Sequence, residues 1–156
     1  MCIGDRYHNQ APVKTVKQAM SAVNPAPQIP QTHQIEIRVR YQETDGQGRV
    51  HHSNYANYFE MGRVEMLRAS GRTYRSLEEE GIMLVVANLV VNFHKGANYD
   101  DLLTLKTTVV RAKGVRVTHR YELFLDDELL ADGETVVAAV DREGNVCRLP
   151  KWLRLG

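Results

Sequence analysis

The sequence predicts an α+β domain in which one long helix packs on an antiparallel sheet of about five strands. Three observations support this fold class. A short segment of alternating apolar and polar residues is followed at once by a long run with helical periodicity, four more strand-like segments follow, and short turns join those segments. Short connections favour antiparallel neighbours, because a parallel neighbour needs a long crossover.

Length and composition limit what kind of protein this is. The chain has 156 residues, of which 43% are hydrophobic, enough for one core and one folded domain. Its net charge of +1 gives no global electrostatic reason to expect a nucleic acid or an anionic membrane as partner. Cys2 and Cys147 are far apart and form neither a disulfide framework nor a metal-ligand pattern, which favours a reducing, cytoplasmic setting. No run approaches the roughly 18 apolar residues of a membrane span.

The first 33 residues differ from the rest. They hold four of the five prolines, many Gln and Asn, and little apolar content. Such composition cannot supply a packed core, so we expect residues 1–33 to be a flexible N-terminal extension, disordered or docked on a partner. The folded domain is expected to span residues 34–156.

The first strand and the loop after it are predicted from residues 35–48. Residues 35–41 alternate with a period of two, as in a half-buried strand. The pattern breaks at residues 44–48, where Gly46 and Gly48 favour a tight loop whose backbone can approach a ligand closely. Asp45 lies at the mouth of this loop.

The long helix is predicted over residues 53–70, about 27 Å of rod. We expect Ser53 to be its N-cap and Gly71 to end it. Its apolar stripe has spacings of three and four and comprises Tyr55, Tyr58, Phe59, Gly62 and Met66. Gly62 suits close contact with a sheet, and the other face carries solvated Arg63, Glu65 and Arg68.

The rest of the chain is predicted to be mainly strand. A short helix over residues 73–80, capped by Thr73, comes first. The expected strands are residues 82–93, buried on both faces, and residues 102–111, 115–123 and 129–140. One helix covers only one face of such a sheet, so we expect a homodimer or homotetramer to cover the remaining apolar surface.

A set of residues in this order is typical of one family. The set comprises Tyr41-Gln42-Glu43-Thr44-Asp45, Gly48, Val50, His52, Tyr55, Phe59-Glu60, Arg63 and Met66-Leu67-Arg68. Over residues 34–153 the chain resembles the hotdog-fold acyl-CoA thioesterases of the 4-hydroxybenzoyl-CoA thioesterase family, most closely their Tol-Pal-associated bacterial branch. The resemblance implies a hotdog fold and places the catalytic aspartate on Asp45. Glu43, Gln47 and Arg49 depart from the family pattern and bear on substrate fit.

Thioester hydrolysis needs a group that attacks or activates water, and donors for the oxygen that gains charge. Asp45 can attack the thioester carbon to give a mixed anhydride, or it can deprotonate a water, and the sequence leaves both open. Free amides at the start of the helix are the expected oxyanion donors. The resemblance places this donor on the His52 amide and suggests that the His52 imidazole orients a water or assists the leaving thiolate.

Two groups of residues are expected to bind the substrate. Those expected around the reacting acyl group are Gly48, Val50, Ser53, Tyr55 and Phe59. The phosphates of coenzyme A call for cations, and Arg111, Lys113 and Arg116 are the candidates, although solvated charges on a sheet edge explain them equally well.

Several alternatives stay open at this point. The dipeptide 45–46 is common in turns, and His51 with His52 lacks the further donors of a metal site, so no metal is predicted. No cofactor is expected beyond the coenzyme A of the substrate. His94 and His119 fall in strand patterns and are expected to be sheet residues with ordinary hydrogen bonds. A hotdog acyl-thioester dehydratase, a non-catalytic acyl-CoA-binding regulator and a scaffold that uses the proline-rich arm are the rival functions, and the acyl group is open.

Overall fold

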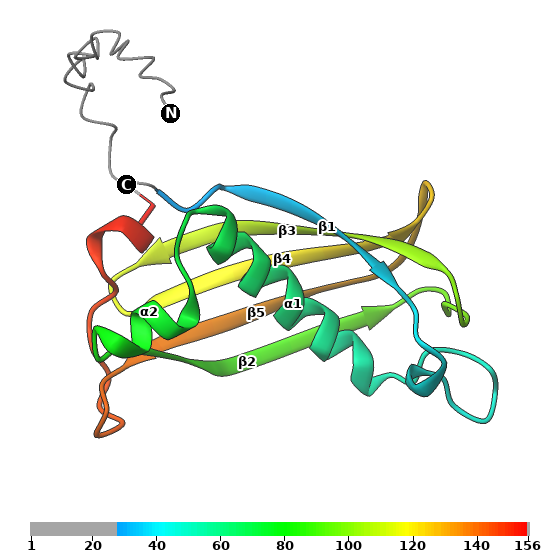
Figure 1. The fold of residues 1–156 in the computed structure, drawn as a ribbon, viewed down its shortest axis with the longest axis horizontal. Coiled ribbons are helices and arrows are strands. Elements are labelled where there is room, and N and C mark those ends of the chain that lie inside the picture. The colour runs from blue at the N-terminus through cyan, green and yellow to red at the C-terminus, as the bar shows by residue number, and fades with distance from the viewer. Residues whose placement is uncertain (1–27, 156) are drawn as a thin grey trace, which may run out of the picture.

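Helix α1 lies across one face of a five-stranded antiparallel sheet in the computed structural model, which describes residues 28–155 (Figure 1). The strand order is β1-β3-β4-β5-β2, so β1 and β2 are the two edges. The strands are β1 Thr32–Arg38, β2 Met83–Phe93, β3 Leu102–Lys113, β4 Arg116–Leu125 and β5 Glu128–Val140. The helices are α1 Ser53–Ala69 and α2 Tyr74–Glu79, with single 3₁₀ turns at Tyr41–Glu43 and Lys151–Leu153.

The predicted fold class is confirmed, with small shifts at the ends of elements. Strand β1 begins at Thr32 and ends at Arg38, because the chain turns through a 3₁₀ segment at Tyr41–Glu43 before it reaches Asp45. Most of the predicted extension lies outside the described residues. Ile29, near the start of the described part, is already buried in the core.

Helix α1 buries the stripe that the sequence predicts. Tyr55, Tyr58, Phe59, Gly62 and Met66 are all buried. A Cβ on Gly62 would lie 2.8 Å from Leu105 Cδ2 and closer still to the Thr107 hydroxyl, so only glycine allows the helix to approach β3 this closely. The prediction that Ser53 is the N-cap is wrong: His52 occupies that position, and Ser53 is the first helical residue.

The helix bridges two buried clusters. The cluster at the end of the sheet that carries the Asp45 loop includes Tyr58, Phe59 and Tyr121, and the cluster at the other end includes Met66 and Val109. Because one rigid rod packs in both, the core fixes the position of the first turn of α1, where the site is built.

Two predictions about polar side chains are wrong. Arg63 does not face solvent: its side chain is 7% exposed, its Nη2 donates to Glu60 at 2.8 Å, and its Nε has no partner among residues 28–155. His119 is a buried sheet residue, but its Nδ1 lacks the expected hydrogen bond. Burial, and next the nearby charge of Arg63, lower the pKa of His119 to about 3. Glu65 and Arg68 lie on the exposed face of α1, as expected, and form an ion pair there.

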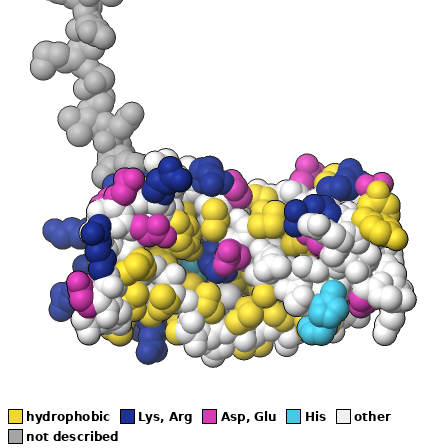
Figure 2. Space-filling model, turned by 60° about the horizontal axis from the view of Figure 1, so that its bottom comes forward, with side chains coloured by type: hydrophobic (Ala, Val, Ile, Leu, Met, Phe, Trp, Pro, Cys, Tyr) yellow, Lys and Arg dark blue, Asp and Glu magenta, His cyan; other side chains and the backbone are white. Residues whose placement is uncertain are grey.

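The prediction that residues 82–93 are buried on both faces is wrong for the single chain. Strand β2 pairs only with β5, and its exposed apolar side chains are Val85, Val86, Leu89, Val90 and Phe93, at 42–54% exposure. Figure 2, which turns the β2 side of Figure 1 forward, shows hydrophobic side chains gathered on this face. Nothing within residues 28–155 covers this apolar edge, and exposed apolar surface of this kind is typical of an interaction site.

The remaining elements agree with the sequence. The side chain of Thr73 caps α2 by accepting a hydrogen bond from the Ser76 amide at 3.1 Å, and β3, β4 and β5 match the predicted strands to within a few residues. No helix in the described part of the chain is long and apolar enough to cross a membrane.

Candidate active site

The loop that carries Asp45 is anchored by a buried carboxylate. Glu43 is 5% exposed and accepts hydrogen bonds from the Arg40 amide (2.8 Å), the Arg40 guanidinium (2.6 and 2.9 Å) and the Tyr58 hydroxyl (2.8 Å). Burial alone would raise the pKa of Glu43, but these hydrogen bonds favour the charged form and hold the pKa below its usual value. Glu43, which stands where the family pattern has an aspartate, therefore links the loop to α1 through its hydrogen bond with Tyr58.

Asp45 is held by its own loop. Its Oδ1 accepts a hydrogen bond from the Gln47 amide at 2.8 Å, its amide donates to the Arg49 carbonyl at 2.8 Å, and its carbonyl accepts from the Gly48 amide at 2.9 Å. Gly48 has φ of 76°, a left-handed conformation that favours glycine. These bonds leave Asp45 Oδ2 without a partner among the described residues.

The first turn of α1 supplies donors next to this loop. The His51 amide and the Asn54 side chain both donate to the Glu43 carbonyl, at 2.8 and 2.9 Å, which ties the helix start to the Asp45 loop. The Ser53 amide faces His51 Nδ1 at 3.3 Å, whereas the His52 amide has no hydrogen-bond partner within residues 28–155. An unpaired amide at the positive end of a helix can stabilise an oxyanion.

A pocket of about 380 Å³ opens between the Asp45 loop, the first turn of α1 and the segment that follows β2. Its walls include Asp45, Val50, His52, Tyr55, Phe93 and His94. Polar groups and apolar side chains thus meet in one concave site, the usual form of a small-molecule site.

The structure brings together only part of the predicted site. Asp45, His52, Val50 and Tyr55 line the pocket. Gly48 and Ser53 lie on the same loop and helix turn but are exposed outside it. Phe59 does not line the pocket: it is fully buried and stacks on Tyr121 with ring centroids 4.3 Å apart, and its contact with substrate stays a prediction.

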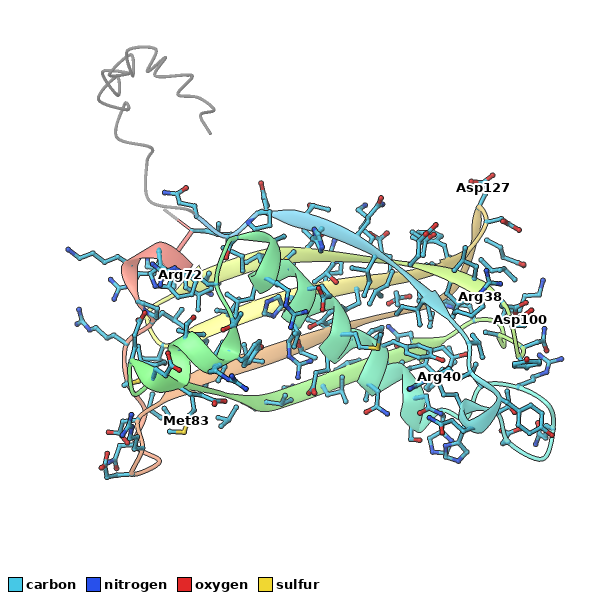
Figure 3. The ribbon with its side chains drawn as sticks, in the orientation of Figure 1. Arg38, Arg40, Arg72, Met83, Asp100 and Asp127 are labelled. Atoms are coloured by element: carbon cyan, nitrogen blue, oxygen red, sulfur yellow. The ribbon has the colours of Figure 1, made fainter. Side chains whose placement is uncertain are left out.

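The predicted coenzyme A cations are not at this pocket in the single chain. Arg111, Lys113 and Arg116 lie at the turn between β3 and β4, at the opposite end of the sheet from the Asp45 loop (Figure 1). Figure 3 marks the two ends: Arg40 lies at the loop end, and Met83 and Arg72 lie at the other.

Sequence reasoning missed the wall contributed by residues 93–96. His94 Nε2 lies 2.5 Å from Asp132 Oδ2, and Asn92 Nδ2 donates to Asp132 Oδ1 at 2.8 Å. The hydrogen bond from Asn92, and then that with His94, lower the pKa of Asp132. Lys95 forms an ion pair with Glu128 at 2.7 Å. Asn92, His94 and Asp132 come together only through the pairing of β2 with β5, and a single sequence does not give the register of that pairing.

The described residues contain no group of three or more His, Cys, Asp or Glu that could hold a metal ion.

One long helix on an antiparallel sheet, with a carboxylate in the loop before the helix, is the arrangement expected of the hotdog-fold thioester hydrolases, and the solved structures that match this chain include thioesterases. The model of the thioesterase superfamily matches residues 47–131, just over half of the chain, and the match begins two residues after Asp45. The chain belongs to the thioesterase superfamily, as its resemblance indicates. The assignment to the Tol-Pal-associated branch stays a prediction.

Relatives and solved structures agree with this family. The chain is 35% identical over 106 residues to the acyl-CoA thioesterase YbgC of Haemophilus influenzae, covering 67% of this chain and 78% of that protein. It is 30% identical over 106 residues to the acyl-CoA thioester hydrolase YbgC of Escherichia coli, covering 67% and 79%. The structure of the DHNA-CoA thioesterase from Staphylococcus aureus has 32% identity and a TM-score of 0.73, covering 76% of this chain and 80% of that chain.

Proposed function

We propose that this protein hydrolyses an acyl-CoA to a free acid and coenzyme A, with Asp45 as nucleophile or general base. The observation that carries the proposal is that Asp45 and His52, the N-cap of α1, line the same pocket. The relatives named acyl-CoA thioesterases support the choice of acyl-CoA as the thioester.

The geometry of the loop suits Asp45 to this role. One carboxylate oxygen is held by the Gln47 amide and the other is free toward a ligand, so the reactive oxygen is oriented without being blocked. In one version the free oxygen attacks the thioester carbon, and in the other it takes a proton from the attacking water.

The start of α1 supports the reaction through its donors. The His52 amide is proposed to donate to the carbonyl oxygen as it gains negative charge, and the field of the helix adds to this stabilisation. The His52 imidazole, in the pocket wall, is proposed to orient a water or to assist the leaving thiolate. No cofactor enters this scheme, because coenzyme A is part of the substrate.

We further propose that the protein acts as a homodimer joined along β2, or as a homotetramer made of two such dimers. A two-fold axis through the free edge of β2 would pair this strand with its copy and cover Val86, Leu89 and Val90. Antiparallel pairing would then place the Met83 end of one chain beside the Phe93 end of the other. The partner's Arg111, Lys113 and Arg116 would in this way approach the pocket from which they are distant within one chain.

The division of the chain follows from the packing. We propose that the thioesterase domain begins near residue 28 rather than at residue 34, because Ile29 is buried and Thr32 opens β1. The rest of the predicted extension lies outside the described residues. A cytoplasmic location stays a prediction from the cysteine pattern.

The test is the release of free thiol from a panel of short, long and aromatic acyl-CoAs. We expect hydrolysis of at least one of them, and we expect D45N to lower kcat by roughly 100-fold or more. The matched control is D127N, which changes an exposed carboxylate in the β4–β5 turn (Figure 3) and should leave the rate unchanged. Cleavage that survives D45N would refute the role of Asp45, and a wild type that binds acyl-CoA without cleaving it would refute the proposed activity.

A further inference from the structure

The far wall of the pocket contains a histidine that the proposed function does not use. His94 follows the last residue of β2, and its side chain is 45% exposed, on the wall that contains Phe93. Since its Nε2 faces Asp132, its Nδ1 is the ring nitrogen that remains free of protein partners among the described residues. A neutral imidazole that donates from Nε2 presents a lone pair at Nδ1, which can accept a proton.

Asp132 is fixed on both of its oxygens. Asn92 Nδ2 donates to Oδ1 at 2.8 Å, while His94 Nε2 lies 2.5 Å from Oδ2. Asn92 lies directly opposite Asp132 in the β2–β5 register, and His94 follows two residues later along the chain, so both side chains reach the same carboxylate. This arrangement fixes both the rotamer of the carboxylate and the tautomer of the imidazole, the role that a carboxylate has beside a catalytic histidine.

Nothing in the packing of the fold requires this trio. All three residues are polar and lie outside the two buried clusters. Asn92 and His94 lie at the end of the edge strand β2, Asp132 lies on the neighbouring strand β5, and His94 shares the pocket with Asp45. The pocket volume of about 380 Å³ leaves space for the reacting end of an acyl group together with a water, whose share of volume is about 30 Å³.

We propose that His94 is a second catalytic residue, the general base that activates the hydrolytic water, and that Asp132 is its positioning residue. The inference rests on the proposed thioesterase function and deepens it by dividing the chemistry into two steps. Asp45 is the nucleophile of the first step, and His94 serves the second.

In the first step a carboxylate oxygen of Asp45 attacks the thioester carbon. A C–O bond forms, the C–S bond breaks, and coenzyme A leaves as the thiolate with the bonding electron pair. In the second step water attacks the acyl carbon of the mixed anhydride while His94 Nδ1 takes its proton. The bond from the acyl carbon to the Asp45 oxygen breaks and regenerates the carboxylate, and the proton on His94 passes to solvent or to the thiolate.

This division predicts distinct kinetics for two variants, measured as thiol release on mixing enzyme with excess of the acyl-CoA that the wild type cleaves best. In H94A we expect a rapid burst of one equivalent of thiol per active site, followed by a steady-state rate lowered about 100-fold, because only the second step is impaired. In D45N both the burst and the steady state should be lost. Imidazole added to H94A should restore part of the steady-state rate, since the truncated side chain opens onto solvent.

Asp132 is tested by D132N, with E122Q as its matched control. Glu122 is opposite Asp132 on β4 but is paired with Lys106 at 3.1 Å instead of with a histidine. D132N should lower kcat at least tenfold at unchanged KM, with the thiol burst retained, whereas E122Q should behave as the wild type.

Three results would overturn the inference, and they separate it from the proposed function. If H94A keeps the wild-type kcat while D45N is inactive, hydrolysis by Asp45 stands and His94 has no catalytic role. If H94A loses the burst and the steady state together and imidazole restores neither, His94 acts only in the structure. If the wild type cleaves no thioester, both proposals fail.

Discussion

The hydroxyl of Tyr58 donates a 2.8 Å hydrogen bond to the carboxylate of Glu43, and this bond ties the second turn of α1 to the segment directly before Asp45. Both side chains are buried. The carboxylate also accepts three hydrogen bonds from Arg40, one from its amide and two from its guanidinium, so four donors converge on one buried charge. The position of Asp45 therefore depends on a contact made inside the core.

Replacing Tyr58 with phenylalanine removes this donor and leaves the rest of the ring in place. Hydrogen bonds to charged groups contribute about 1.5–3 kcal/mol, so we expect Y58F to lower the free energy of unfolding by about 2 kcal/mol, measured by urea denaturation. The thiol-release rate should fall as well, because the Asp45 loop loses an anchor. Y99F, at a tyrosine that is 55% exposed, is the matched control and should change neither quantity. A Y58F protein as stable as the wild type would show that Arg40 alone holds Glu43.

Substituting Gly62 with alanine tests the close approach of α1 to β3. The new methyl group would overlap Leu105 and Thr107, so helix and sheet would have to separate, although alanine is the better helix former. We expect G62A to destabilise the fold by about 1–3 kcal/mol in thermal or urea unfolding. M61A, which truncates the neighbouring side chain at 40% exposure, should cost less. Stabilisation by G62A would mean that the helix has room that the packing does not indicate.

Acid sensitivity is expected to arise in part from His119. Its pKa is about 3 when folded, against 6.5 for an unperturbed histidine, because burial and then the Arg63 charge disfavour the imidazolium. Between these values the unfolded chain binds a proton that the folded protein does not, so this contribution to stability is complete above about pH 6.5 and is lost progressively below it.

H119Q should therefore flatten the pH dependence of unfolding. We expect the slope between about pH 4.5 and 6.5 to fall by up to about 1.4 kcal/mol per pH unit relative to the wild type, measured by urea titrations at several pH values. The slope is the diagnostic quantity, since a change in packing shifts stability equally at every pH. An unchanged slope would show that His119 is protonated in the folded protein.

The free edge of β2 is expected to be the interface between two copies. V90K places a charge at a side chain that is 48% exposed in the single chain and that the proposed dimer buries. Analytical ultracentrifugation should give a dimer or tetramer for the wild type and a monomer for V90K, and thiol release should be lost with the dimer. V146K, at an exposed apolar residue outside β2, should leave the mass unchanged. A monomeric wild type with full activity would refute the proposed assembly.

The sequence predicted those parts of the fold that depend on local patterns. The stripe of α1 needs only the helical period, and the alternation in β3, β4 and β5 needs only the two-residue period. The same patterns located Asp45 and His52, because a loop followed by a helix start is a local feature.

The failed predictions concern side chains whose surroundings come from distant segments. Arg63 carries a charge and was assigned to solvent, yet it is buried in the same region as His119 of β4. A strand rich in Val and Leu reads the same whether it is central or lies at an edge, which explains the error for β2. His94 becomes a site residue only when β5 brings Asp132 beside it, 38 residues later in the chain.

The basic residues at the β3–β4 turn give a test of whether the partner completes the site. If the phosphates of coenzyme A bind to Arg111 and Lys113, R111A/K113A should raise KM for an acyl-CoA about tenfold with little change in kcat. KM for the matching acyl-pantetheine, which lacks the nucleotide phosphates, should not change.

Mixed dimers of this variant and D45N test whether Arg111 and Lys113 serve the pocket of the other chain, as the proposed dimer requires. One site of each mixed dimer would carry both defects and the other site neither, so at low acyl-CoA concentration the co-refolded mixture should be more active than the average of the two variants measured separately. If each chain served its own pocket, every site would carry one defect and the activity of the mixture would not exceed that average.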